Sequence, residues 1–266
     1  MTNPRVLIYF LGPAGAGKST LTSSFSEWCE ERDIATAIVN LDPGAEDLPY
    51  APDVDVRDYV TTSDIMRKYG LGPNGAQVVA ADLMINYIAE IRELIDELKV
   101  DYVLVDTPGQ VELFAYRPWG PTIVNYLEPT YSHLIFIMDP FLAPSAANFV
   151  SQVLLALSIH FRIQYPITFV MNKMDLLREH EKERILNYIN NWDLVYDEIR
   201  EEARTPYMLF GLEVYRAISE LGESIKIIPT SAMTQEGFHE IYFEIQSVAM
   251  GGEDVVTGKR NYDFEI

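Results

Sequence analysis

A glycine-rich loop near the N-terminus, "GPAGAGKST", constrains the fold of this chain more than any other feature. It fits the spacing G-x-x-x-x-G-K-[ST], and it joins an apolar, strand-like run to a helical pattern. In such a loop, backbone N–H groups turn toward a phosphate, and the helix start adds partial positive charge. We therefore predict an α/β fold whose phosphate contacts come from Gly12, Pro13, Ala14, Gly15, Ala16, Gly17, Lys18, Ser19 and Thr20. Lys18 is expected to reach the β- and γ-phosphates, and the Ser19 hydroxyl to bind Mg²⁺.

Short runs rich in β-branched and aromatic residues alternate with longer amphipathic segments along the chain. Runs that are apolar throughout indicate strands buried on both faces of a parallel sheet. Strands alternating with helices predict an α/β, doubly wound, mainly parallel sheet with helical insertions. The expected strands are Val6–Phe10, Thr36–Leu41, Tyr102–Val105, His133–Met138, Ile167–Met171 and Ile225–Ile228. The expected helices are Ser19–Glu31, Val78–Lys99, Ala146–Ser158 and Gly237–Val248.

Chain length and connection lengths predict one domain over residues 1–250. Two connections are much longer than is usual between strands and helices. They are expected to be insertions, at about 43–99 and at 176–224, the second helical and rich in aromatic residues. The segment 251–266 mixes glycine and charge, and it is expected to be a flexible tail.

Charge and cysteine content limit the partners of the chain. Its formal net charge is −20, which repels phosphate backbones and anionic lipid, so we expect neither nucleic-acid nor membrane binding. No apolar run is seen to approach the ~18 residues that a membrane-spanning helix needs. Cys29 is the only cysteine, which excludes a disulfide framework. We expect a cytoplasmic protein.

The segment "YVLVDTPGQ" places a second set of polar residues at the end of a buried strand. Asp106 is a candidate ligand of Mg²⁺, directly or through its water ligands. The N–H of Gly109 can approach a γ-phosphate. Gln110 lies where Ras-like GTPases keep the glutamine that orients the attacking water, and Glu112 is a weaker candidate for the same task. Asp42, in "NLDPGAEDLPY", is equally well explained as a catalytic or metal-binding carboxylate or as part of an Asp-Pro-Gly turn.

The segment "FVMNKMD" predicts the base of the nucleotide. Asn172, Lys173 and Asp175 follow another buried strand, so they are expected at the ligand-binding edge of the sheet. The Asp175 carboxylate can accept hydrogen bonds from guanine N1–H and the exocyclic amine, groups that adenine lacks at those positions. Lys173 can lie against the base, and Asn172 can join this loop to the phosphate loop. Ser231 and Ala232 match the last guanine-contact motif, so GTP is predicted over ATP.

Several other features have ordinary structural explanations. The run "GLGPNGA" reads by itself as a β-turn. His133 and His160 are expected to be satisfied core residues, and the acidic segment Glu179–Arg184 a solvated helix face. The aromatic residues of the second insertion are expected to pack, although a groove for an amphipathic partner is an alternative.

Taken together, the motifs resemble those of the GPN-loop GTPases, a family within the SIMIBI class of P-loop NTPases. "GPAGAGKST", "NLDPGAEDLPY", "VDVRDYV", "GLGPNGA", "DTPGQVELF", "NKMDLL" and "TSA" occur in the order of that family. The resemblance implies a homodimer formed through the nucleotide face, in which Asn74 of each subunit enters the phosphate site of the other. It implies that Asp42 is a catalytic or Mg²⁺-shell carboxylate, and it supports Asp106 near the metal and Gln110 on the water. Lacking a long acidic C-terminal extension, the chain is similar to a compact archaeal-type member.

Two other functions are consistent with parts of the sequence. A small-molecule kinase on the same scaffold would need an arginine-bearing lid, which is not evident, and Asn-Lys-x-Asp argues against it. A chaperone-like binding module, in which GTP gates a groove for an unknown protein client and turnover is incidental, is the second. Release of phosphate without an added acceptor would exclude the kinase.

Overall fold

The computed structural model describes residues 5–127, 131–202, 211, 213–216 and 225–249. The tail at 251–266 and the aromatic residues at 207–210 lie outside this part of the chain. The described residues include both long insertions in large part.

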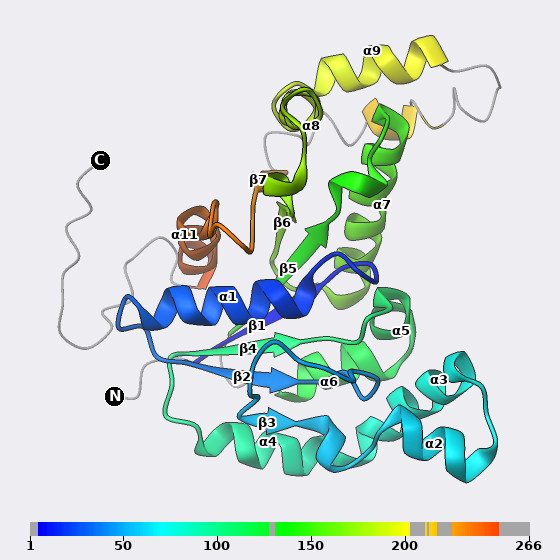
Figure 1. Cartoon of the computed structure of the whole chain (residues 1–266), viewed down its shortest axis with the longest axis vertical. Helices are drawn as coiled ribbons and strands as arrows, with labels where there is room; N and C mark the ends of the chain where they lie inside the picture. Colours follow the sequence, from blue (N-terminus) through cyan, green and yellow to red (C-terminus); the bar gives the residue numbers. More distant parts are fainter. Residues whose placement is uncertain (1–4, 128–130, 203–210, 212, 217–224, 250–266) are drawn as a thin grey trace.

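A seven-stranded, all-parallel sheet forms the centre of the described structure (Figure 1). Its order is β3-β2-β4-β1-β5-β6-β7, with β1 at the centre between β4 and β5. This confirms the doubly wound α/β prediction. The strands are β1 (Val6–Leu11), β2 (Thr36–Asn40), β3 (Val54–Asp55), β4 (Tyr102–Asp106), β5 (Tyr131–Met138), β6 (Ile167–Met171) and β7 (Ile227–Pro229).

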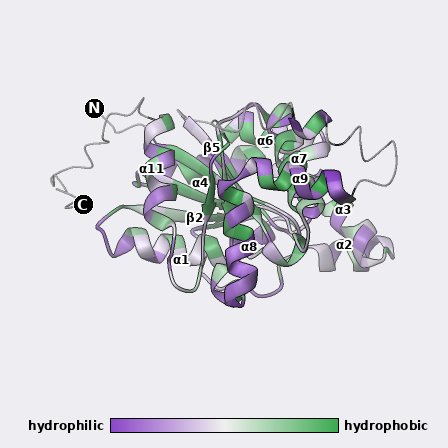
Figure 2. Ribbon diagram, turned by 90° about the horizontal axis from the view of Figure 1, so that it is seen from above, coloured by the Kyte–Doolittle hydropathy of each residue, from purple (hydrophilic) through white to green (hydrophobic). Residues whose placement is uncertain are grey.

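Helices cover both faces of the sheet, which is why the strands are apolar throughout. Alternate residues of β1 enter different cores: Ile8 and Phe10 pack with α1 (Lys18–Glu30) and α11 (Phe238–Ala249). Leu7 and Tyr9 face the larger core on the opposite side. That core is covered by α3 (Pro73–Met84), α4 (Ile88–Glu97), α5 (Val111–Tyr116), α6 (Trp119–Leu127) and α7 (Ala146–Ile163). The view in Figure 2 shows the hydrophobic strands enclosed between these helices.

The second insertion folds as α8 (Glu179–Asn190) and α9 (Trp192–Glu202). Most of the acidic segment at the start of α8 is exposed, as predicted, and α8 is largely hydrophilic in Figure 2. The aromatic residues that are described here pack against one another. The Trp192 ring stacks on Tyr215 at 5.7 Å between centroids, and Tyr188 lies 5.6 Å from Phe149 of α7.

The first insertion differs from its prediction in two ways. Its residues Val54–Asp55 form β3, which pairs with β2, so part of the segment belongs to the sheet. Two residues are too short to give a periodic signal. The single helix expected at Val78–Lys99 is instead α3 and α4, separated by a short 3₁₀ turn at Ile85–Tyr87. Apolar spacing continues through the break, and so the sequence did not reveal it.

The Gly-Pro-Asn run begins a helix, and the β-turn interpretation is therefore wrong. Gly70, with a φ of 63°, ends α2 (Thr62–Tyr69), and Gly72 is the N-cap of α3. Pro73 occupies the first helical position, where its missing N–H has no intrahelical partner to lose. Asn74 thus lies in the first turn of α3. The antiparallel-like pair α2–α3 projects beyond the sheet on the side to which β2 and β4 point (Figure 1).

One described helix, α7, is long and apolar enough to span a membrane by length and composition. The expectation that no segment reaches this length is therefore wrong. About half of α7, 44%, is buried inside the protein, because one side of it packs on the sheet and on α9. Its apolar character is explained by this packing, as in the core helix of many proteins.

His133 is buried in β5, and we expect it to make stability depend on pH. Its Nε2 lies 2.8 Å from the Thr168 hydroxyl, and burial lowers its pKa to about 4. The unfolded chain therefore takes up a proton near the ordinary histidine pKa of about 6.5, whereas the folded chain resists until about pH 4. Between about pH 7 and about pH 5, His133 alone should lower the free energy of unfolding by about 2 kcal/mol.

Urea unfolding of the wild type and His133→Gln at both pH values tests this expectation. The variant should lose about 2 kcal/mol less than the wild type on acidification, whatever its stability at neutral pH. His180→Gln, at an exposed position on α8, is the control and should follow the wild type. Equal losses in wild type and His133→Gln would contradict the assignment.

Candidate nucleotide site

The phosphate loop connects β1 to α1 in a conformation that depends on glycine. Gly17 is the N-cap of α1 with a φ of 94°, and a Cβ there would lie 2.7 Å from Nδ2 of Asn172. A side chain at this position would strain the backbone and would collide with the Asn172 side chain. Ser19 and Thr20 lie in the first turn of α1, where free N–H groups can face an anion.

Lys18 is the buried cation of this loop. Its ammonium donates to the carbonyl oxygens of Gly12 (2.8 Å), Pro13 (3.0 Å) and Gly109 (2.9 Å). Burial lowers its pKa, and the nearby carboxylates of Asp106 and Asp42 oppose that change. All three donors are engaged, so a bound phosphate must replace at least one carbonyl. Lys18 therefore connects the phosphate loop to the loop after β4.

Asp106 ends β4 and is almost completely buried. Its Oδ2 accepts a 2.6 Å hydrogen bond from the Tyr50 hydroxyl, while its buried Oδ1 has no hydrogen-bond partner among the described residues. Burial raises the Asp106 pKa to about 6, and the hydroxyls of Ser19 and Tyr50 and the charge of Lys18 oppose that rise.

These groups fit a magnesium ion bound together with a nucleotide. A buried carboxylate oxygen without a partner, near a hydroxyl at the start of α1, supplies oxygen ligands of the kind that Mg²⁺ prefers. No group of three or more His, Cys, Asp or Glu side chains that could hold a metal alone occurs in the described part. In a site of the proposed kind, phosphates and water would provide the other ligands.

Asp42 lies at the same edge of the sheet and faces the loop after β4. Its Oδ1 accepts from the N–H of Gly44 (2.8 Å) and its Oδ2 from the N–H of Gly109 (3.0 Å). Burial raises its pKa, and these two backbone donors oppose the change. The Asp-Pro-Gly turn is present, since the Ala45 N–H donates to the Asp42 carbonyl at 3.3 Å, and the carboxylate of the same residue faces Gly109. The turn therefore does not exclude the catalytic or metal-binding role, which stays a prediction. Because the Gly109 N–H already donates to Asp42, a γ-phosphate would have to compete with this carboxylate for the same donor.

The two candidates for orienting water lie directly after Gly109. Gln110 is the N-cap residue of α5, and Glu112 lies in the first turn of that helix. Both side chains are exposed. The charge of Glu112 acts on Lys18, which places it near the phosphate region as well.

The base motif is joined to the phosphate loop by Asn172. This side chain, 1% exposed, donates to the Ala16 carbonyl (3.1 Å) and accepts from the Ala232 N–H (3.1 Å). Lys173 crosses to the Gly15 carbonyl and forms a 2.7 Å ion pair with Asp139 at the end of β5. Asp175 is exposed in the short turn Met174–Leu176, and no hydrogen bond from a described residue engages it. The structure therefore brings the predicted guanine-contact residues, including buried Ser231, to one side of the phosphate loop.

Asn74 does not join this cluster. Its side chain is exposed, and no described residue forms a hydrogen bond with it. Its helix nevertheless borders the site: a Cβ added at Gly44 would lie 3.6 Å from the amide nitrogen of Gln77 in α3.

Three residues near the site were not predicted from the sequence. Tyr50 contacts Asp106 across 56 positions, and Asp139 pairs with Lys173. Arg57 forms an ion pair with Asp55 and donates to the Ala45 carbonyl, which fixes the loop between Asp42 and Tyr50. Tyr50 and Arg57 do belong to motifs noted above, but nothing in their spacing indicates these partners.

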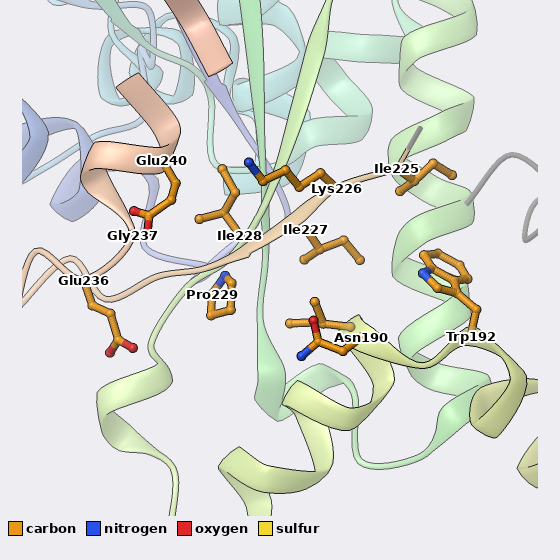
Figure 3. A pocket seen from close by; sticks show the side chains of 11 residues that line it. Asn190, Trp192, Ile225, Lys226, Ile227, Ile228, Pro229, Glu236, Gly237 and Glu240 are labelled. Carbon is orange, nitrogen blue, oxygen red and sulfur yellow. The ribbon is translucent and has the colours of Figure 1, made fainter. Parts of the chain in front are cut away.

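A separate hollow of about 700 Å³ lies along β7, between α8 and α11 (Figure 3). Trp192, Ile225 and Ile227 make one side apolar, and Glu236 and Glu240 lie on the side of α11. No residue of the nucleotide site lines it. Ile189, Asn190 and Trp192 are its lining residues from the second insertion, so the hollow borders the region where a partner groove was considered.

Comparison with known proteins agrees with this geometry. A family model described as "conserved hypothetical ATP binding protein" matches residues 10–250. The chain is 36% identical to GPN-loop GTPase PAB0955 of Pyrococcus abyssi over 243 residues, which cover 89% of this chain and 94% of the relative. It is 28% identical to GPN-loop GTPase 3 of Kluyveromyces lactis, over 98% of both chains.

The crystal structure of PAB0955, titled as a GTPase in apo form, superposes with a TM-score of 0.84. It is 32% identical and covers 92% of this chain and 98% of its own. The family description names ATP, but the Asn-Lys-x-Asp motif and the names of the relatives point to GTP. The resemblance inferred from the motifs is confirmed: this chain belongs to the GPN-loop GTPase family.

Proposed function

We propose that this chain is a Mg²⁺-dependent GTP hydrolase that works as a homodimer, with Asn74 of each subunit acting in the phosphate site of the other. Membership of the GPN-loop GTPase family makes GTP hydrolysis its activity. The metal, the dimer and the role of Asn74 are the parts that we add. The observation that carries the dimer and the role of Asn74 is the exposed Asn74 side chain, which has no hydrogen-bond partner among the described residues although its helix borders the site. The unpartnered buried Oδ1 of Asp106 supports the metal.

The residues of one subunit account for nucleotide binding. Backbone N–H groups from Gly15 to Thr20 and the ammonium of Lys18 bind the phosphates. Asp175 accepts from guanine, with Asn172 holding its loop in place. Ser19 and Asp106 would hold the metal, with Asp42 next to them. A bound Mg²⁺ would neutralise phosphate charge.

Hydrolysis needs a positioned water and donors for the charge that develops on the phosphates. Gln110 orients the water, and Asp42 or Glu112 assists it. An amide from the partner subunit supplies fixed donors at the phosphates, in the way that an arginine finger does but without a formal charge. Loss of the γ-phosphate frees the Gly109 N–H for Asp42, the arrangement seen here, and weakens the dimer.

We further propose that this cycle acts on a protein client in the cytoplasm, as a step in the assembly of protein complexes. The net charge of −20 favours basic partners over nucleic acid or a membrane. A chaperone-like module with incidental turnover is the alternative, which the apolar hollow beside Trp192 would favour. Client binding that survives the loss of turnover in Asn74→Ala would support that alternative.

Specific activity measured against protein concentration tests the dimeric mechanism. Phosphate release per chain, without an added acceptor, should rise with concentration and then reach a plateau as dimers form. Sedimentation with a non-hydrolysable GTP analogue should give a dimer over the same range of concentrations. A monomer with constant activity per chain would contradict the proposal, and activity that requires an acceptor would favour a kinase.

A further inference from the structure

We propose that Tyr50 is a positioning residue for the Asp106 carboxylate and that it thereby strengthens binding of Mg²⁺ with the nucleotide. The inference rests on the proposed Mg²⁺ dependence of the site.

The hydrogen bond between Tyr50 and Asp106 is short, and it uses only one of the two carboxylate oxygens. The Tyr50 hydroxyl donates to Oδ2 of Asp106 at 2.6 Å, a length typical of a hydrogen bond to a charged acceptor. Oδ1 is also buried and accepts no hydrogen bond from a described residue, although the nearby Ser19 hydroxyl opposes the rise of the Asp106 pKa. Tyr50 thus occupies one oxygen and leaves the other for a ligand. Without the hydroxyl, the carboxylate could rotate or accept through either oxygen.

Tyr50 is itself held in place from several sides. Its ring packs partly buried against the core under α1, and the Ser23 hydroxyl of α1 donates to the neighbouring Pro49 carbonyl at 3.2 Å. Arg57 donates to the carbonyls of Ala45 and Glu46 at 3.1 and 3.3 Å. A donor fixed in this way loses little conformational entropy when the site is filled.

The loop after β2, which carries Tyr50, contacts the segment 106–109 at both of its ends. Asp42 bonds the N–H of Gly109, and Tyr50 bonds Asp106, so the loop after β2 brackets residues 106–109. Groups that orient metal ligands from behind commonly change metal affinity by about 10- to 100-fold when removed. Because the Tyr50 hydroxyl donates to the carboxylate and forms no hydrogen bond with a described residue of the phosphate loop, the effect of removing it should be confined to binding that depends on the metal.

Binding of a fluorescent GDP analogue to the full chain, in EDTA and across a Mg²⁺ titration, tests the inference. Tyr50→Phe keeps the ring and removes the hydroxyl. We expect its apparent affinity for Mg²⁺ to fall by about 10-fold or more, while nucleotide affinity in EDTA stays within about twofold of the wild type. Tyr188→Phe is the matched control, because it removes a 2.6 Å hydrogen bond to the Glu198 carboxylate far from the nucleotide. It should behave as the wild type in both conditions.

The outcomes separate this inference from the proposed function. If Mg²⁺ strengthens binding equally in wild type and Tyr50→Phe, the positioning role is overturned and the metal site stands. If Tyr50→Phe weakens binding equally in EDTA and Mg²⁺, the hydroxyl has only a structural role. If Mg²⁺ leaves the wild-type affinity unchanged, the magnesium part of the proposed function fails, and this inference fails with it.

Discussion

Asp175→Asn is expected to weaken GTP binding by about 10³-fold and to transfer the preference to XTP. The carboxylate accepts from two donors of guanine, and hydrogen bonds to charged groups contribute about 1.5–3 kcal/mol each. An asparagine loses one of these acceptors and places an N–H₂ group against the guanine amine. Xanthine carries a carbonyl oxygen at that position, so the same N–H₂ group finds an acceptor.

Competition of GTP, ATP and XTP against a fluorescent GDP analogue measures this change. The backbone of the loop should be unaffected, because Asp175 is exposed and Asn172 holds the loop through Ala16 and Ala232. Asp193→Asn, the same substitution at an exposed position of α9, should leave all three affinities unchanged. Retained GTP affinity together with no gain for XTP would show that the base does not contact Asp175.

Asn74→Ala should lower the maximal rate of GTP hydrolysis by about 10²-fold, with GTP affinity changed by less than about threefold. Removing one fixed donor at a site of developing charge costs about 10²- to 10³-fold in other enzymes. The structure explains why binding should survive, since the Asn74 side chain is exposed and forms no hydrogen bond with a described residue. Single-turnover hydrolysis and equilibrium binding separate the two effects. Asn187→Ala, an exposed helical asparagine on α8, is the control.

Mixing two inactive variants distinguishes action in trans from action in cis. Lys18→Ala lacks the phosphate cation but keeps Asn74, whereas Asn74→Ala has the opposite defect. If Asn74 acts on the partner, a heterodimer contains one complete site, so random mixing should restore up to about a quarter of wild-type activity. If Asn74 acts within its own subunit, no complete site forms and the mixture stays inactive.

A series of contacts links the loop after β4 to the helix pair α2–α3. Gly109 donates to Asp42, Asp42 accepts from Gly44, and Gly44 lies beside Gln77 of α3. A γ-phosphate that accepts a hydrogen bond from the Gly109 N–H would remove the bond to Asp42, which is the first contact of this series. The helix that carries Asn74 therefore lies next to the residues whose contacts a γ-phosphate would change under the proposed mechanism.

Local patterns in the sequence were sufficient for the fold class and for the phosphate and base motifs. Strands buried on both faces must be apolar throughout, as β1 is, and this signal needs no knowledge of tertiary contacts. Gly12 to Ser19 are adjacent in sequence, so their spacing already defines the backbone that they form. Asn172 and Asp175 follow a strand, and the carboxyl ends of parallel strands meet at one edge.

Elements too short to change the periodic pattern of apolar residues could not be predicted from the sequence. The two residues of β3 and the break between α3 and α4 leave the apolar pattern unchanged, and Pro73 is equally compatible with a turn or a helix start.

Only the tertiary structure decided which polar atoms meet. Tyr50 and Asp106 are 56 positions apart, Asp42 and Gly109 are 67 apart, and Asn172 reaches Ala16 across 156. A periodic pattern reports which side of an element is buried, but not which loop packs over it. These hydrogen bonds depend on how the loops pack at the end of the sheet, and that packing involves the whole chain at once. The sequence by itself determined that a guanine nucleotide site exists; the packing of its loops decided which oxygen of Asp106 accepts from Tyr50 and which is left without a hydrogen bond.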